Sequence, residues 1–188
     1  MISDKDRSGF IGGSDTGYVM KSWGTKTFEK WWRIKQGLEE DNFESEAMQA
    51  GTAYEHKILD ALNIPDLEKD KQIIKGLLRV NLDGNTATKV YEVKTYKAGK
   101  PFKVSKDYWR QVQVEMYALG VRQGEIVAYG LLPEDYNNFY RDIDPKRLSH
   151  HKIKYDKRFI ADYEKRLQYL CKCLEDGTWP DEGEVGYV

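Results

Sequence analysis

Two carboxylates and one ammonium group stand at a spacing that could bind a metal ion and a phosphate. Eight residues separate Asp83 from the tripeptide Glu92-Val93-Lys94. On a strand, side chains two residues apart share a face, so Glu92 and Lys94 would point together and Val93 into the core. Two close carboxylates repel unless a positive group lies between them, and oxygen ligands suit Mg²⁺. Lys94 could then orient or help deprotonate an attacking water and offset phosphate charge.

The same pattern also has an ordinary explanation. The chain contains 30 Lys and Arg residues against 31 Asp and Glu residues, so a glutamate two residues before a lysine is common. Such pairs often lie on exposed strands as solvated cross-strand charges. The flanking Val90, Tyr91 and Val93 favour a buried strand instead, and a buried strand favours the metal site.

Glu55 is a candidate third acid. It follows Gly51 by one turn, in a segment with the apolar spacing of a helix. A glycine inside a helix costs about 1 kcal/mol relative to alanine, and close approach of this helix to the sheet would be a reason for it. Glu55 would then reach a metal directly or through water, whereas the alternative is an exposed helical glutamate. We interpret the adjacent His56 as a structural or surface residue.

Basic residues gather directly after the Glu92-Val93-Lys94 motif. Residues 94–110 contain six bases and one acid, a local charge of +5 in a chain whose net charge is −1. This pattern is typical of a surface that attracts a phosphate backbone, although it also fits a solvated lysine-rich loop. Gln111, on the helix that follows, could hydrogen-bond a phosphate or a water, whereas Gln113 should point away. The candidate DNA contacts in this segment are Lys97, Lys100, Lys103 and Arg110.

A second candidate anion site lies near the start of the chain. Gly12 and Gly13 leave the backbone bare just before a short helix that we expect to begin near Ser14. Helix N-termini bind anions, and Arg7 could supply a bidentate partner. The simpler interpretation is an ordinary helix cap with a tight turn before it.

These residues must be positioned by an alternation of helices and strands. Ser45 and Ser105 are expected to cap helices, and Thr27 is expected to begin one. The turn residues 83–85 separate two strands, which predicts an antiparallel hairpin with Asp83 at the end of its first strand. The predicted helices cover residues 27–36, 46–62, 106–120 and 157–175, and the predicted strands cover residues 71–75, 77–82, 89–96, 125–132 and 148–155.

Length and composition describe one ordinary domain. The 188 residues are 40% hydrophobic and 32% charged, which is too apolar for a disordered chain and fits a single α+β unit. No apolar run approaches the roughly 20 residues that span a bilayer, and the N-terminus has no apolar signal core, so we expect a cytoplasmic protein without membrane contact. Cys171 and Cys173 form neither a disulfide framework nor a four-cysteine metal site. Residues 177–188 are expected to be an acidic tail that is poorly ordered or packs only through Trp179 and Pro180.

Five motifs, taken in order, resemble those of the PD-(D/E)XK nuclease superfamily. They are R-x-G-x-I-x-x-S-D from Arg7, G-x-x-x-E ending at Glu55, N-x-D-G around Asp83, E-V-K from Glu92 and Q-V-Q from Gln111. More narrowly, residues 7–113 look like the phage lambda-exonuclease branch, often called YqaJ-like viral recombinases. The chain departs from the superfamily name at Leu82, where proline is usual, and it has too few cysteines for the iron–sulfur relatives.

The resemblance implies a metal-binding role for the acids. Asp83, Glu92 and the backbone carbonyl of Val93 would bind Mg²⁺, for which Mn²⁺ could substitute. Glu55 would serve a second metal or its water. One metal would lower the pKa of the attacking water, and the other would stabilise the leaving oxygen.

The resemblance also implies roles for the polar residues around these acids. Lys94 would position and activate the nucleophilic water, and Gln111 would steady that water or the scissile phosphate. Arg7, Ser14 and Asn81 match positions that hold the terminal 5′-phosphate of the DNA strand. Asn81 replaces a serine present in some relatives but keeps a hydrogen-bond donor.

The fold implied is a restriction-endonuclease-like α/β (α+β) core over residues 1–176, with a mixed central β-sheet flanked by helices. The function implied is a Mg²⁺-dependent 5′-to-3′ exonuclease, encoded by a phage or prophage in a bacterial cell, that resects double-stranded DNA ends for single-strand-annealing recombination. The partners implied are duplex DNA ends, a single-strand annealing protein and further copies of the chain in a homotrimer. Three alternatives stay open: a structure-selective endonuclease on the same fold, a non-cleaving recombination adaptor that binds DNA ends, and a plain structural protein in which the charged cluster is accidental.

Overall fold

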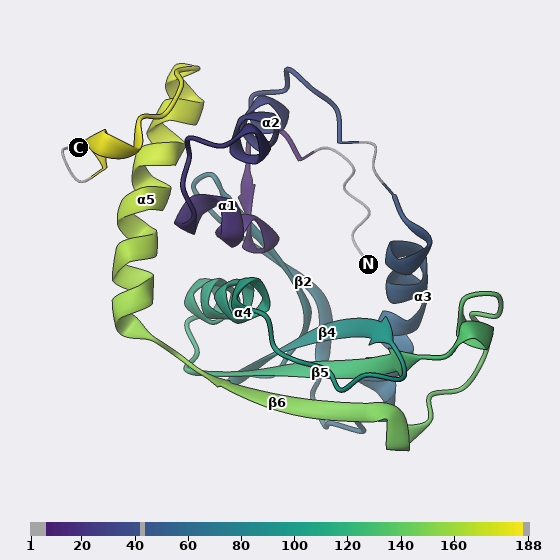
Figure 1. Ribbon diagram of the computed structural model, residues 1–188. Helices are drawn as coiled ribbons and strands as arrows, with labels where there is room; N and C mark the ends of the chain where they lie inside the picture. Colours follow the sequence, from purple (N-terminus) through teal and green to yellow (C-terminus); the bar gives the residue numbers. More distant parts are fainter. Residues whose placement is uncertain (1–6, 42–43, 186–188) are drawn as a thin grey trace.

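In the computed structural model, which describes residues 7–41 and 44–185, six strands join into one mixed sheet (Figure 1). The strand order is β1-β3-β4-β5-β6, and β2 also pairs with β3. Strand β1 runs parallel to β3, and β4 runs parallel to β5, whereas the remaining pairs are antiparallel. The strands are β1 (Ile11–Gly12), β2 (Glu68–Lys75), β3 (Leu78–Asn85), β4 (Lys89–Lys97), β5 (Gln123–Leu131) and β6 (Leu148–Lys154).

Helices cover both faces of this sheet. One face packs against α4, with α1, α2 and α5 outside it, and the other packs against α3 (Figure 1). The predicted fold class, a mixed sheet flanked by helices in one domain, is therefore confirmed. The helices are α1 (Thr16–Met20), α2 (Lys26–Lys35), α3 (Glu46–Ala61), α4 (Lys106–Leu119) and α5 (Lys157–Asp176), and the short 3₁₀ turns are η1 (Gly13–Asp15), η2 (Pro133–Asp135), η3 (Pro145–Arg147) and η4 (Glu182–Glu184).

Helix capping follows the sequence signals with one shift. The hydroxyls of Ser45 and Ser105 accept backbone N–H groups at 3.2 and 3.1 Å, as expected of N-caps. Helix α2 begins at Lys26 rather than at Thr27, because Thr25 has extended backbone and its hydroxyl accepts the Phe28 N–H at 3.1 Å. Of two threonines two residues apart, the first took the capping position.

The hairpin of β3 and β4 is present, but its turn lies later than predicted. Strand β3 continues through residues 83–85, and the turn is closed by Thr86, whose N–H donates to the Lys89 carbonyl at 2.9 Å. Gly84 serves close packing rather than a turn, because a Cβ atom there would lie 3.0 Å from the Leu59 side chain of α3. Asp83 therefore lies inside a strand and not at its end.

The acidic segment after α5 is packed as far as the structure describes it, to residue 185. Glu182 accepts the Trp23 backbone N–H at 3.0 Å and pairs with Arg166 at 2.9 Å. Pro180 is buried, as one of the two expectations had it, but Trp179 is 51% exposed. The expectation that this tail is poorly ordered, or packs only through Trp179 and Pro180, is therefore wrong for residues 177–185. Glu182 finds hydrogen-bond donors on α5 and just after α1. Residues 186–188 lie outside the described residues.

Within the described residues, no helix is both long enough and apolar enough to cross a membrane.

Candidate active site

Asp83 and Glu92 face each other where the β3–β4 hairpin opens. Backbone pairing of the two strands is confined to Gly84 and Asn85 of β3 with residues 90–91 of β4. At the next register position the Asp83 carboxylate, rather than a backbone carbonyl, accepts the N–H of β4, from Val93 at 2.8 Å. The strands separate there, so the two acids line the opening.

Glu92, Lys94 and Gln111 form one hydrogen-bonded group on the α4 face of the sheet. Lys94 Nζ lies 2.6 Å from Glu92 Oε1 and 3.2 Å from Gln111 Oε1. Gln111 Nε2 donates to Glu92 Oε1 at 2.7 Å and to Glu115 Oε1 at 2.9 Å. Glu92 and Glu115 are only 3% and 1% exposed, so water screens these charges little. Val93, between the two charged residues, points the other way into the core beneath α3.

Burial and neighbouring negative charges raise the pKa values of Asp83 and Glu115. Burial, and then the negative charges of Glu92 and Glu55, holds the pKa of Asp83 well above its usual range. Burial followed by Glu92 does the same to the pKa of Glu115. Burial opposes the charge of Lys94, but the neighbouring Glu92 and Asp83 carboxylates outweigh it and raise the pKa of the ammonium group. A protonated Lys94 suits orienting a water or phosphate better than taking a proton from water.

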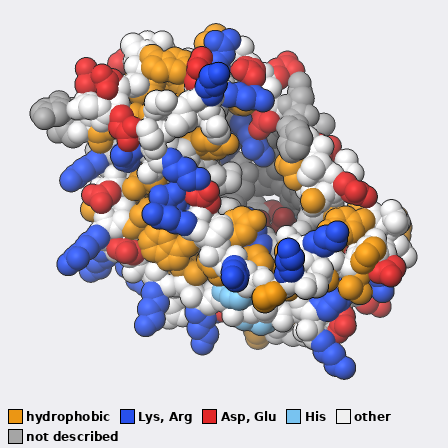
Figure 2. Space-filling model, viewed as in Figure 1, with side chains coloured by type: hydrophobic (Ala, Val, Ile, Leu, Met, Phe, Trp, Pro, Cys, Tyr) orange, Lys and Arg blue, Asp and Glu red, His pale blue; other side chains and the backbone are white. Residues whose placement is uncertain are grey.

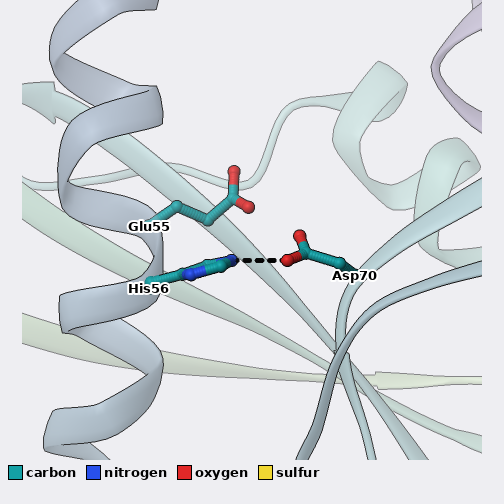
Figure 3. A group of neighbouring side chains, drawn as sticks. All are labelled: Glu55, His56 and Asp70. Atoms are coloured by element: carbon teal, nitrogen blue, oxygen red, sulfur yellow. Dashed lines mark ion pairs between the residues drawn. The ribbon is translucent and has the colours of Figure 1, made fainter. Parts of the chain in front are cut away.

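Glu55 projects from α3 beside His56, and both side chains reach toward Asp70 on β2 (Figure 3). His56 Nε2 lies 2.8 Å from Asp70 Oδ2, so this histidine makes a structural contact. In the part of the chain that the structure describes, these three are the one group of His, Cys, Asp or Glu side chains whose ligand atoms all lie within 4.8 Å of one another. Burial, and then the charge of Glu92, raises the pKa of Glu55.

The predicted acids fit a hard divalent cation, although not as one tight group. The ligand atoms of Asp83, Glu92 and Glu55 are not all within 4.8 Å of one another. Glu92 Oε2, however, is buried and has no hydrogen-bond partner among the described residues. A buried carboxylate oxygen without a partner is costly, and a cation would offset that cost and the mutual repulsion of the acids. Oxygen donors of this kind suit Mg²⁺.

The N-terminal residues predicted to bind an anion meet in one pocket. Arg7, Ser14 and Asn81 line a cavity of about 160 Å³ whose wall also contains Gln111 and Arg79. The Arg7 guanidinium lies 3.4 Å from the Asp41 carboxylate. Because Gln111 also belongs to the Glu92–Lys94 group, the pocket borders the candidate metal site.

Ser14 itself is not a helix cap. The chain makes the 3₁₀ turn η1 before α1, and the Asp15 carboxylate accepts the Gly12 N–H at 2.7 Å in the capping role. Asp15 is buried and also binds Lys35 at 2.6 Å and the Trp31 indole N–H at 3.0 Å. The hydroxyl of Ser14 is left at the surface of the pocket.

The basic segment splits into exposed lysines and one buried arginine. Lys97, Lys100 and Lys103 are exposed. Arg110 is 8% exposed, and its guanidinium lies 3.1 Å from the Asp107 carboxylate. The prediction that Arg110 contacts DNA is therefore not supported, because its helical position turns it inward. Figure 2 shows a hollow in the face viewed, with an acidic side chain in its depth and basic side chains along its lower rim.

Sequence reasoning missed Glu115 and Arg79. Glu115 lies one helical turn after Gln111, so the i, i+4 spacing was a signal for a shared face. Arg79 lies two residues before Asn81 on β3, so the strand period placed both on one face. Gln113 points away from the site, as predicted, and its amide binds the chain between β6 and α5 at Lys154 and Asp156.

The mixed sheet, the acid on each strand of an opened hairpin and the lysine two residues beyond the second acid lie as the motif resemblance predicts. No protein-family model and no curated protein matches the sequence.

Solved structures do match this chain. The alkaline exonuclease LHK-Exo of Laribacter hongkongensis aligns with a TM-score of 0.68 and 20% sequence identity, over 90% of this chain and 89% of its own. The same enzyme in complex with dAMP aligns with a TM-score of 0.67. A phage-related exonuclease of Haemophilus somnus aligns with a TM-score of 0.63 and 14% identity, over 89% of this chain and 94% of its own. Identities this low show that this chain shares its fold with these exonuclease structures, and at the level of the fold the predicted resemblance is confirmed.

Proposed function

We propose that this protein is a Mg²⁺-dependent exodeoxyribonuclease that hydrolyses phosphodiester bonds from the 5′ ends of duplex DNA. The observation that carries the proposal is the position of Gln111. Its side chain lines the anion pocket and also hydrogen-bonds the Glu92–Lys94 pair. A terminal phosphate in the pocket would therefore lie on one side of Gln111, and the bond to be cleaved would lie on the other.

The residues around the hairpin would divide the chemistry. Asp83, Glu92 and the Val93 carbonyl would hold Mg²⁺, and Glu55 would serve a second ion or its water. The metal, when bound, supplies a Lewis acid and a water of lowered pKa. Lys94 keeps its proton, so it orients the attacking water and offsets the charge that builds on the phosphate.

The anion pocket supports action at ends rather than within a strand. Arg7 supplies a guanidinium that can bind a terminal phosphate with two hydrogen bonds, and Ser14 and Asn81 supply neutral donors. Solved structures with this fold include named exonucleases, and one of these contains dAMP. We further propose that the 3′ single strands left by 5′-to-3′ digestion pass to a single-strand annealing protein and that the chain works as a homotrimer.

Digestion of a linear duplex tests this function. The duplex is labelled at one end, carries either a 5′-phosphate or a 5′-hydroxyl, and is incubated with Mg²⁺ or EDTA beside a closed circular duplex. We expect metal-dependent loss of linear DNA alone, faster with the phosphate. Nicking of the circle would replace the proposal with an endonuclease, and end binding without cleavage would replace it with an adaptor.

Two variants assign the residues. Asp83→Asn should lower the cleavage rate by more than about 100-fold while leaving DNA-end affinity intact, because it removes a metal ligand and not a DNA contact. Arg7→Ala should reduce the preference for a 5′-phosphate by about 10-fold, the worth of one hydrogen bond between charged groups. Asp142→Asn, at an exposed acid, is the matched control and should leave both quantities unchanged. Equal rates for Asp83→Asn and wild type would disprove the metal site.

A further inference from the structure

Glu115 is a buried acid that the proposed chemistry does not use. It lies on α4, is 1% exposed, and accepts a hydrogen bond from Gln111 Nε2 at 2.9 Å. Its side chain also backs the bare turn of the anion pocket, since a Cβ atom at Gly13 would lie 3.8 Å from Glu115 Cγ. Burying a carboxylate here is expensive, so its presence calls for a reason.

The hydrogen bonds of Gln111 define one orientation of its amide. Lys94 can only donate, so it must face the amide oxygen, at 3.2 Å. The amide nitrogen then points to two acceptors, Glu92 Oε1 at 2.7 Å and Glu115 Oε1 at 2.9 Å. Of these three partners of the Gln111 amide, Glu115 is the one to which the proposed chemistry gives no role at the metal or with the phosphate. Its hydrogen bond therefore supports Gln111 from outside the reacting group.

We propose that Glu115 is a positioning residue that locks the Gln111 amide with its oxygen toward Lys94 and its nitrogen toward Glu92. The inference rests on the proposed function in assigning Lys94 and Gln111 to DNA cleavage. Gln111 also lines the anion pocket. By holding Gln111, Glu115 therefore positions a phosphate bound in that pocket relative to the Lys94–Glu92 pair. Without it one amide proton of the half-buried Gln111 loses its partner, and the side chain gains freedom to turn.

The support requires an acceptor oxygen at this position. The amide oxygen of a glutamine could accept the same Gln111 proton. Alanine offers no acceptor. Glu115→Gln should therefore preserve the orientation of Gln111, and Glu115→Ala should lose it.

Cleavage kinetics of four variants test the proposal. Glu115→Ala should lower kcat by about 10- to 100-fold, the usual effect of losing a residue that orients a reacting group, with KM for DNA ends unchanged. Glu115→Gln should stay within a few-fold of wild type. Adding Glu115→Ala to Gln111→Ala should lower kcat no further, since Glu115 acts through Gln111. A multiplied loss in the double variant, or a Glu115→Gln variant as slow as Glu115→Ala, would overturn the proposal.

A second readout needs no DNA cleavage. The side-chain amide signals of Gln111 in a ¹H–¹⁵N spectrum, assigned by their loss in Gln111→Ala, should shift and exchange faster with water in Glu115→Ala and persist in Glu115→Gln. Glu125→Gln alters another buried acid, on β5, and is the matched control that should leave these signals and kcat unchanged. A wild type that does not cleave DNA would refute the proposed function, whereas unchanged Gln111 signals in Glu115→Ala would refute the positioning role.

Discussion

Asp83 occupies its place in the fold at a cost in stability. Burial and the charges of Glu92 and Glu55 raise its pKa, so its carboxylate is less stable in the folded protein than in the unfolded chain. The hydrogen bond from the Val93 N–H works against this effect but does not cancel it. Residues with this property gather at functional sites, because the chemistry there needs charges that packing alone would remove.

Replacing this carboxylate should stabilise the protein in the absence of metal. A raised pKa in the folded state means that the folded state binds more protons than the unfolded state. The free energy of unfolding of the wild type therefore falls as the pH rises above about 4, the ordinary range for aspartate, toward the raised pKa. Asp83→Asn removes this part of the slope, and we expect a gain of about 1–3 kcal/mol at pH 7. Urea unfolding between pH 4.5 and 8 measures it.

Added Mg²⁺ and a matched variant make this prediction specific. Mg²⁺ should stabilise the wild type more than Asp83→Asn, since a ligand stabilises only the form that binds it. Glu55 and Glu115 have pKa shifts of the same sign, so part of the slope should persist in the variant. Asp142→Asn, at an exposed position, should leave the slope unchanged. A slope as steep in Asp83→Asn as in the wild type would contradict the prediction.

At the scale of elements, glycines set how closely two helices approach the sheet. A Cβ atom at Gly51 of α3 would lie 3.2 Å from Thr95 Oγ1 of β4, which is the close approach predicted for this helix. On the other face, a Cβ atom at Gly124 of β5 would lie 2.5 Å from Val112 Cγ1 of α4. The missing side chains at these glycines let α3, which carries Glu55, and α4, which carries Gln111, lie close to the sheet.

Gly124→Ala should therefore strain the α4 face. The added methyl would overlap Val112 and crowd the Met116 sulfur at 3.2 Å, so α4 must move or its side chains must leave their rotamers. We expect a loss of about 1–3 kcal/mol in the free energy of unfolding, measured in urea. Gly24→Ala, where the nearest atom is 4.0 Å away, is the control and should change stability by less than about 0.5 kcal/mol. Equal stability of the two variants would show that α4 yields without cost.

For the whole molecule, the distribution of charge matters more than its sum. The net charge is only −1, yet exposed lysines follow β4 directly beyond the acids of the hairpin. Two acids of the C-terminal segment are engaged: Glu182 by Arg166 and the Trp23 backbone, and Glu184 by Tyr169. These contacts keep that segment on α5 and α1, away from the lysines.

Neutralising the exposed lysines at the end of β4 and in the segment after it should weaken DNA binding in a salt-dependent way. The logarithm of the binding constant falls with log salt concentration, and each lost phosphate contact makes this slope less steep by about 0.9. Replacing Lys97, Lys100 and Lys103 by glutamine should therefore make it less steep by about 2 to 3. Fluorescence anisotropy with a labelled duplex measures the slope. Replacing three exposed lysines of α5 by glutamine makes the same change of charge on another side of the molecule (Figure 1), and these are Lys157, Lys165 and Lys172. A similar slope in both triple variants would show that DNA does not track the segment after β4.

The sequence by itself determined the features that depend on neighbours along the chain. Ser45 and Ser105 cap helices because a hydroxyl needs only the N–H three residues on. Glu92 and Lys94 share a face, with Val93 opposite, because a strand alternates. The α/β class and the hairpin were also predictable, because the patterns that indicate each helix, strand and turn lie within short segments of the chain.

Only the tertiary structure decided where distant segments meet. The sequence pattern predicted a turn at residues 83–85. In the structure β3 continues through these residues, and α3 packs against Gly84. Arg110 read as a surface base, but its place on α4 turned it inward. The i, i+4 spacing places Glu115 on the same helix face as Gln111, but only the packing of α4 on the sheet brings both side chains to Glu92. Each outcome depends on contacts between segments far apart in the chain, which local propensity and spacing do not encode.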